Sequence, residues 1–278
     1  MSRPLPSSSR PASAALTGRL FVRDSGRGVP RQERRPMGSE FCLRQAGARG
    51  GAAADGGTMV EYRIRPYREE DYDAVREVFA ASMSEYAPVL CQHVLRQPWV
   101  LLLLGCTFCL LLASARSLLL PILAVTLLLA LARHLLGYAW STYIERCLAD
   151  DLRDIAASYA ESAGARFWVA EVDERVVGTV GARPADTEGE LALKRMAVRK
   201  GYRGSGIATA LGRTVLAFAR QSGCQAVVLN TLMVQHEARA LYERLGFCWH
   251  RRYVLPTIYG HLANCTITVY RYDLSSAP

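Results

Sequence analysis

Residues 97–137 form the segment that most restricts how this chain can fold. The segment is apolar almost throughout, and Arg116 is the only charged residue in it before Arg133. A single helix across the uncharged part would be about 50 Å long, well beyond a hydrocarbon core of about 30 Å. The sequence Ser114-Ala-Arg-Ser117, followed by Pro121, divides the run into two halves. We therefore expect two short or tilted membrane passes, or a re-entrant hairpin.

A hairpin of this kind returns both of its ends to the same side of the membrane. Arg96 precedes it, and Arg133, His134 and Arg146 follow it. Basic flanks are typical of a cytosolic membrane face, and Arg116 at the turn would snorkel to the far headgroups. The alternative is a hairpin buried in a protein core, which a small domain is too small to cover.

The first 58 residues differ in composition from the rest of the chain. They hold ten arginines and four acidic residues, a net +6 of the +9 carried by all 278 residues. They lack hydrophobic periodicity, so they bury too little apolar surface to offset the entropy of ordering. We expect residues 1–58 to be a disordered basic extension. A mitochondrial presequence is one alternative, although Asp24, Glu33 and Glu40 interrupt a basic face. A nucleic-acid-binding arm is another, but no aromatic residues alternate with the arginines, so we predict no nucleic-acid partner.

A glycine-rich turn occupies Arg203-Gly-Ser-Gly-Ile-Ala208. Gly204 and Gly206 let the backbone approach a ligand without a Cβ in the way, and the amides of the following helix point outward. Such free N–H groups and the positive end of a helix favour phosphate. The turn is neither the dinucleotide fingerprint, because Thr209 replaces its third glycine, nor the Gly-Lys-Ser/Thr phosphate loop. A tight turn without a ligand is the alternative.

Alternation and β-branched residues predict a mixed α/β sheet. From Met59 the expected order is a strand, a helix, the hairpin and another helix, followed by alternating strands and helices. Strands are expected at 166–172, 175–182, 190–198, 225–231, 247–255 and 265–272, and helices at 209–220 and before Phe247. The first two of these strands would be joined across Asp173 and Glu174.

Two motifs in this order resemble those of the GNAT superfamily of N-acetyltransferases. Arg203-x-x-Gly-x-Ala208 is similar to the acetyl-CoA pyrophosphate loop of that superfamily, and Leu241-Tyr-x-x-x-Gly-Phe247 is similar to its later helix-end motif. The position of the apolar insert and the segments 143–155, 167–171 and 176–178 narrow the resemblance to the camello-like, membrane-bound N-acetyltransferases. That group includes cysteine-S-conjugate and aspartate N-acetyltransferases.

The resemblance covers about residues 59–273. It implies a GNAT fold with a mixed central sheet over residues 59–278, interrupted by the membrane hairpin. Members of the group are associated with the endoplasmic reticulum, which implies an endoplasmic reticulum membrane location here, with the catalytic domain on the cytosolic side.

The resemblance also implies which residues form the site. Those for the co-substrate acetyl-CoA are Met196, Ala197, Val198, Arg203, Gly204, Ser205, Gly206, Ile207, Ala208 and Gln235. The backbone N–H groups of Met196 and Val198 would face pantetheine or the thioester oxygen. Tyr242 matches the motif tyrosine and would protonate the CoA thiolate, the alternative being a core tyrosine. Gln235 stands where the family often has Asn, and it keeps the side-chain amide.

The general base is not decided by the sequence. Glu190, at the start of the central strand, and His236, near the start of the last helix, are the candidates. A solvated carboxylate and a helix-capping side chain are the alternatives, and deprotonation of the amine through water is a third route.

Basic residues near the C-terminus are candidates for binding the acceptor. Arg251, Arg252, His261 and Arg271 could bind the carboxylate of an amino acid. The alternative is a solvated basic face next to anionic lipid.

We predict no metal site and no structural disulfide. Cys106 and Cys109 have the spacing of a metal or redox pair, but they lie inside the apolar run and favour packing. The sequence predicts an N-acetyltransferase anchored in the membrane lipid that acetylates a small amino-acid-type amine. Protein lysine N-acetylation and a non-catalytic acetyl-CoA-binding scaffold are the alternatives.

Overall fold

The structure is a computed structural model that describes residues 61–115 and 117–274. The predicted basic extension over residues 1–58 lies outside these described residues, as does Arg116.

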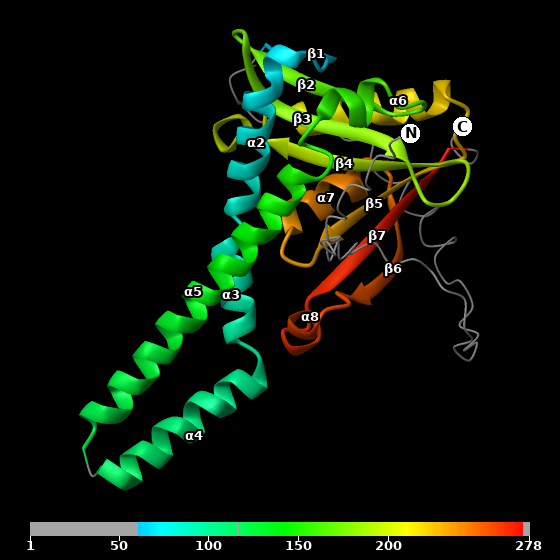
Figure 1. Ribbon diagram of the computed structural model, residues 1–278. Coiled ribbons are helices and arrows are strands. Elements are labelled where there is room, and N and C mark those ends of the chain that lie inside the picture. Colours follow the sequence, from blue (N-terminus) through cyan, green and yellow to red (C-terminus); the bar gives the residue numbers. More distant parts are fainter. Residues whose placement is uncertain (1–60, 116, 275–278) are drawn as a thin grey trace, which may run out of the picture. The chain divides into compact units, whose positions relative to one another are not determined.

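Seven strands form one sheet in the order β1-β2-β3-β4-β5-β7-β6 (Figure 1). They are β1 (Arg63–Pro66), β2 (Arg166–Val172), β3 (Arg175–Pro184), β4 (Glu190–Val198), β5 (Ala226–Leu232), β6 (Cys248–Val254) and β7 (Thr266–Asp273). β4 and β5 are parallel, and every other neighbouring pair is antiparallel. The sheet is therefore mixed, which confirms the predicted fold class.

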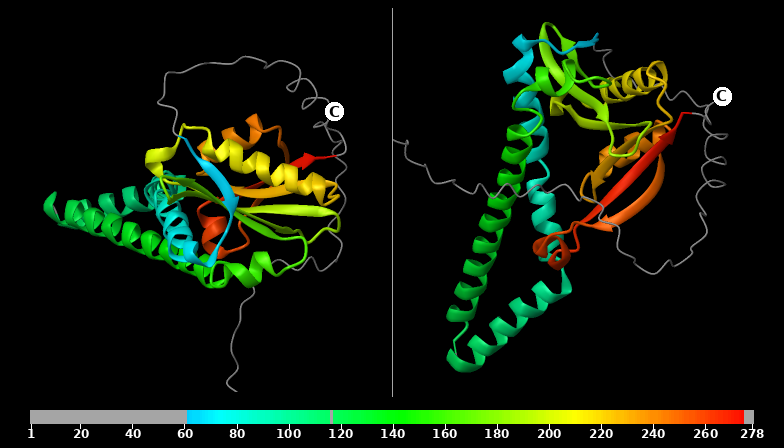
Figure 2. Two further views of the ribbon diagram at one scale, coloured as in Figure 1. Left: turned by 90° about the horizontal axis from the view of Figure 1, so that it is seen from above. Right: turned by 45° about the vertical axis from the view of Figure 1, so that its right-hand side comes forward.

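Helices cover both faces of the sheet. The longer ones are α2 (Tyr72–Ser84), α3 (Ala87–Leu95), α4 (Pro98–Ala115), α5 (Leu119–Ala149), α6 (Ile207–Gln221) and α7 (His236–Arg244). The short ones are η1 (Glu69–Asp71), the π-helical η2 (Ala156–Ala160), η3 (Lys200–Tyr202) and α8 (Ile258–Leu262). Figure 2 shows α6 on one side of the sheet and the green segment that ends in η2 on the other.

The two faces of the sheet have separate hydrophobic cores. On the α6 and α7 face, Leu193, Val198 and Leu229 pack with the helix residues Leu211 and Tyr242. The core on the opposite face joins α2 and η2 to the sheet, with Val78, Tyr159, Phe167, Val169 and Ala197 among its buried residues. β4 contributes to both cores, because alternate residues of a strand point to opposite faces.

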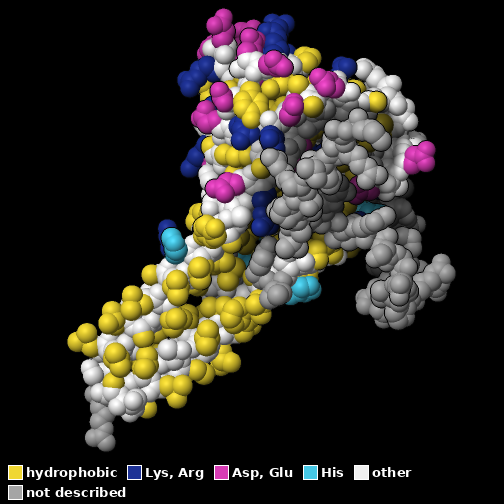
Figure 3. Space-filling model, in the orientation of Figure 1, with side chains coloured by type: hydrophobic (Ala, Val, Ile, Leu, Met, Phe, Trp, Pro, Cys, Tyr) yellow, Lys and Arg dark blue, Asp and Glu magenta, His cyan; other side chains and the backbone are white. Residues whose placement is uncertain are grey.

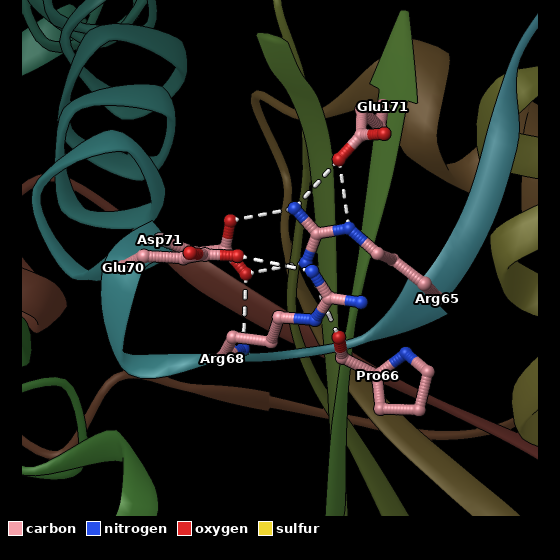
Figure 4. Close-up of polar contacts among 6 residues, drawn as sticks. All are labelled: Arg65, Pro66, Arg68, Glu70, Asp71 and Glu171. Carbon is pink, nitrogen blue, oxygen red and sulfur yellow. Dashed lines mark hydrogen bonds and ion pairs between the residues drawn. The ribbon is translucent and has the colours of Figure 1, made fainter. Parts of the chain in front are cut away.

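A buried arginine fixes the start of this arrangement (Figure 4). Arg65 on β1 donates two hydrogen bonds to Asp71, at 2.6 and 2.8 Å, and one to Glu171 on β2 at 2.7 Å. Asp71 also accepts a hydrogen bond from the backbone N–H of Arg68. These carboxylates raise the pKa of Arg65, and the hydrogen bonds of the cluster join β1, β2 and the start of α2.

α4 and α5 pack against each other as a helical hairpin, and residues 117 and 118 form a bend before α5. Both are long and apolar enough to cross a membrane. Only 6% of the apolar 18-residue stretch of each helix is buried. Leu119, for example, is 78% exposed. Figure 3 shows hydrophobic side chains over the hairpin, whereas acidic and basic side chains gather at the opposite end of the view. A core hairpin would be buried, so this alternative does not describe the structure.

The end of the hairpin differs from the prediction. α5 continues without a break to Ala149, although a separate helix was expected after residue 137. Gly137 is a poor helix former, and a Cβ added there would meet no other atom within 4 Å. Beyond it, Trp140, Ile144 and Cys147 are buried. Packing against α2 and α3 therefore stabilises the second half of α5, where the helix continues from its exposed apolar half into the domain.

The cysteine prediction needs one correction. Six cysteines of the described residues are free, but Cys248 is disulfide-bonded. The prediction of no disulfide was based on the expectation of a cytosol-facing domain, because disulfides are rare in the cytosol. Within residues 61–115 and 117–274 no group of three or more His, Cys, Asp or Glu residues could hold a metal ion.

Candidate active site

The parallel strands β4 and β5 part from each other halfway along the sheet. Their pairing covers three residue pairs, the last of which joins Ala192 to Val228. β4 nevertheless continues to Val198 and β5 to Leu232, and Figure 1 shows the strands separating. The second half of β4 thus has a strand neighbour on its β3 side alone.

A bulge in β4 determines which backbone N–H groups point toward the side where β5 no longer pairs with β4. The register with β3 shifts between Thr179 and Gly181, and Arg195 has a φ of 54°. The carbonyl of Arg195 accepts a hydrogen bond from Thr179 Oγ1 on β3 at 2.9 Å. Because C=O and N–H point in opposite directions across a trans peptide, the N–H of Met196 is directed away from β3.

The same alternation applies to the next two residues. Ala197 is paired with Thr179, and the N–H of Arg199 donates to the Val177 carbonyl at 2.8 Å. In an antiparallel pair hydrogen-bonded and non-hydrogen-bonded positions alternate, so Ala197 bonds to β3 and Val198 does not. Met196 and Val198 therefore present their N–H groups to the opening between β4 and β5, whereas Ala197 does not.

Arg195 is held in its left-handed conformation by an ion pair. Asp151, just after α5, accepts hydrogen bonds from Arg195 Nε at 2.9 and 3.0 Å, and it also accepts one from the Tyr159 hydroxyl. Burial opposes ionisation of both partners, yet their mutual contact lowers the pKa of Asp151 and raises that of Arg195. Phe79 packs beneath the guanidinium at 5.0 Å.

The glycine-rich turn connects β4 to α6. Gly204 and Gly206 have φ values of 83° and 86°, which favour glycine. The first backbone bond of α6 runs from the N–H of Ala210 to the carbonyl of Gly206. The N–H groups of Ile207, Ala208 and Thr209 are thus the orphan donors of a helix start, and they have no acceptor among the described residues. Ser205 donates its hydroxyl to the Tyr202 carbonyl.

The side chain of Arg203 stabilises this turn through hydrogen bonds. Its Nε donates to the Val198 carbonyl at 3.1 Å, and its two terminal nitrogens donate to Glu85, at the end of α2, at 2.9 and 3.0 Å. Ser82 on α2 also donates to the Val198 carbonyl. The guanidinium of Arg203 thus ties the turn to α2 and to the end of β4.

Tyr242 on α7 is buried beside other aromatic rings. It is 5% exposed and packs edge-on against Phe247 and obliquely against Tyr270. Its hydroxyl makes no hydrogen bond to the residues that the structure describes. Burial, together with the nearby phenol of Tyr86, raises the pKa of Tyr242, so the phenol is neutral and able to donate a proton at physiological pH.

Gln235 precedes α7 and links it to α2. Its Oε1 accepts a hydrogen bond from the Leu232 N–H at 2.9 Å, and its Nε2 lies 3.8 Å from the sulfur of Met83. The end of α2 therefore contacts the turn through Glu85, β4 through Ser82 and the start of α7 through Met83.

Glu190 and Arg271 lie at the other end of the sheet. They form an ion pair with each other, and Arg271 also bonds to Asp273 at 2.6 Å. At a rise of about 3.3 Å per residue, Glu190 is roughly 25 Å along β4 from Val198. The structure does not bring Glu190 to Met196 and Val198, and the expectation that it acts as the base finds no support.

Comparisons with known proteins identify the family of this chain. Residues 130–247 match the acetyltransferase (GNAT) family model. The chain is 37% identical over 219 residues to the probable N-acetyltransferase camello of Xenopus tropicalis, an alignment that spans 78% of this chain and 100% of that protein. It is also 43% identical over 194 residues to human N-acetyltransferase 8B, spanning 68% of this chain and 85% of that protein. The chain belongs to the camello-like N-acetyltransferases of the GNAT family.

This N-acetyltransferase is thus an acetyl-CoA-dependent enzyme, as the resemblance implied. A solved GNAT-family acetyltransferase from Staphylococcus aureus covers 77% of this chain and 99% of its own, with 20% identity and a TM-score of 0.48.

Several residues of the N-acetyltransferase site were missed by the sequence analysis. Glu85 and Tyr86 reach it from the connection between α2 and α3, and Asp151 reaches it from the turn after α5, all more than forty positions from their partners. The run Asp150-Asp151 after an apolar helix was a visible signal, because two acids there need a partner. Of the residues predicted to bind the acceptor, Arg252 lines a pocket next to α7. His236, a candidate base, lines the same pocket. Arg251 and His261 are exposed outside that pocket.

Proposed function

We propose that this chain is a membrane-anchored enzyme that transfers the acetyl group of acetyl-CoA to the amino group of a small amino-acid-type acceptor, such as a cysteine S-conjugate. The observation that carries the transfer step is the pair of β4 amides, Met196 and Val198, that face the gap left by β5. Only η3 and the glycine-rich turn separate them from the free amides at the start of α6.

The two sets of amides suit the two ends of acetyl-CoA. The N–H groups of Ile207, Ala208 and Thr209 would bind the pyrophosphate, helped by the helix dipole and by the absence of a Cβ at Gly204 and Gly206. Acetyl-CoA supplies an acetyl group activated as a thioester. The N–H groups of Met196 and Val198 would stabilise the negative charge that develops on its oxygen, a contribution of typically about 3 kcal/mol per donor.

Tyr242 is proposed as the acid. Attack of the neutral amine forms a C–N bond and breaks the C–S bond, and the departing thiolate takes its proton from the Tyr242 hydroxyl. The raised pKa of Tyr242 keeps that proton in place until the thiolate forms. The amine loses its own proton to water, since Glu190 is paired with Arg271 at a distance from the site.

The proposed location is the endoplasmic reticulum membrane, with the catalytic domain on the cytosolic side. α4 and α5 would form the anchor. Arg96 and Arg133 line one pocket at the domain end of the hairpin, so positive charge lies where the helices return to the domain. Basic residues at this end favour a cytosolic face.

The test is CoA release by membranes that carry the full chain, offered S-benzylcysteine, aspartate or a lysine-containing peptide. We expect turnover with an amino acid and little with the peptide. Turnover with the peptide alone would establish protein lysine as the acceptor and contradict the proposal.

A further inference from the structure

A pocket of about 330 Å³ lies between α3, the start of α7 and strands β6 and β7. Seven of its ten lining residues are basic or polar: Gln92, His93, Arg96, His236, Arg239, Arg252 and Thr266, together with Val89, Met233 and Val234. Three arginines and two histidines thus share one small space, and the lining contains no Asp or Glu.

The arginines of this pocket differ from the ion-paired arginines of the domain. Arg65, Arg195, Arg199, Arg203 and Arg271 each form an ion pair with a carboxylate. Arg96, Arg239 and Arg252 form none within residues 61–115 and 117–274. Arg239 donates to the Tyr270 hydroxyl at 3.3 Å, and that hydroxyl donates to Glu243 at 2.7 Å, so Arg239 contacts a carboxylate only through the phenol. Like charges that share a partly enclosed space repel one another unless an anion joins them.

The pocket adjoins the proposed site of transfer along two helices. Tyr86, whose phenol raises the pKa of Tyr242, directly precedes α3. Val89, one helical turn further along α3, lines the pocket. On α7, Arg239 lies three residues before Tyr242, so both lie on the same face of the helix. Arg239 of the pocket lining is therefore within one helical turn of the proposed acid.

The sheet beneath α7 adds two buried hydroxyl groups. Thr231 on β5 and Thr268 on β7 are directly paired; they are 2% and 0% exposed, and neither Oγ1 has a hydrogen-bond partner in the structure. Thr268 shares its face of β7 with Thr266, which lines the pocket, and with Tyr270, which packs against Tyr242. Unpaired buried hydroxyls cost free energy, and Thr268 lies two residues along β7 from Thr266 of the pocket lining.

We infer that this pocket binds the anionic group of the acceptor, a carboxylate in the case of an amino acid, through Arg96, Arg239 and Arg252. The inference rests on the proposed function and names its acceptor site. An α-amino acid carries its amine two bonds from the carboxylate carbon, so a carboxylate held here keeps the amine beside Tyr242. The same charge repels a lysine ammonium, so the pocket selects amines that carry an anion.

The test compares two acceptors that differ only in that charge, S-benzylcysteine and S-benzylcysteinamide. The variants are Arg252→Gln and Arg96→Gln in the full-length protein in membranes, with Arg244→Gln as the matched control. Arg244 is an exposed arginine on α7 outside the pocket. Arg96 and Arg252 are both exposed, so neither replacement leaves a buried unpaired group.

Each pocket variant should raise KM for S-benzylcysteine on the order of tenfold, the effect of losing one charge-assisted hydrogen bond. KM for acetyl-CoA and turnover of the amide should stay unchanged, and Arg244→Gln should match the wild type. Equal effects on both acceptors, or none, would overturn the inference while the proposed function stands. Wild-type enzyme that neither acetylates nor, by calorimetry, binds S-benzylcysteine would overturn both.

Discussion

Asp151 and Arg195 join the end of the apolar helix α5 to the bulge of the central strand. Asp151 lies two residues after α5, and its carboxylate accepts hydrogen bonds from Arg195 Nε at 2.9 and 3.0 Å. Arg195 is the residue whose positive φ turns the N–H of Met196 away from β3. The pair thus connects the proposed anchor to the proposed oxyanion donor.

Asp151→Asn should reduce kcat/KM by about 100-fold, because loss of one oxyanion donor has an effect of that order. The measurement is steady-state kinetics beside thermal unfolding of the solubilised protein. Glu77→Gln is the control, since it removes a carboxylate that pairs with Arg199 but is 64% exposed. We expect that variant to change stability by no more than about 0.5 kcal/mol. Equal losses in the two variants would show that the buried pair has no special role.

The same pair predicts a pH dependence of stability. Burial raises the pKa of Asp151, but the hydrogen bonds and charge of Arg195 outweigh it, and the folded-state pKa is lowered. A lowered pKa contributes stability above the unfolded value of about 3.9 that is lost as pH falls through the folded value. Unfolding temperatures between pH 5 and pH 3 should therefore fall more steeply for the wild type than for Asp151→Asn. Parallel curves would contradict this account.

Gly206→Ala should raise KM for acetyl-CoA several-fold. Gly206 has a φ of 86° directly before α6, and forcing alanine into this region costs roughly 1 to 2 kcal/mol or moves the helix start. Gly201→Ala is the matched control, because Gly201 lies in the same connection, has no positive φ and has open space around it. If the two variants have the same KM, the turn does not hold acetyl-CoA.

Asn264 reports the side of the membrane on which the domain lies. The sequence Asn264-Cys-Thr266 is a glycosylation sequon, and Asn264 is exposed just before β7. A cytosolic domain predicts no change in mass on glycosidase treatment of the chain from human cells. A glycosidase-sensitive form would place the domain in the lumen.

Much of the fold was predictable because local patterns determine it. The bounds expected for β2 and β4 match the structure, and the turn at Asp173 and Glu174 adopts the positive φ values of a tight hairpin. The two apolar helices and the turn between them were predictable for the same reason, since composition decides burial in lipid.

The rest depends on contacts between distant residues. A positive φ at an arginine is unfavourable by itself, so nothing local predicts the bulge at Arg195, which Asp151 stabilises from 44 positions away. Arg251, Arg252 and Arg271 look equivalent in sequence, yet Arg252 alone among them lines the pocket, while Arg271 is neutralised by Glu190.

Release of CoA by membranes carrying the full chain, with S-benzylcysteine as acceptor and Tyr242→Phe beside the wild type, tests the central claim most directly. We predict turnover by the wild type and a fall of about 10²-fold or more in the variant, the usual contribution of a general acid. Because the pKa of Tyr242 is raised above its ordinary value of about 10, wild-type kcat should not decline through ionisation of this phenol up to that pH. Equal turnover by the two proteins would contradict the account.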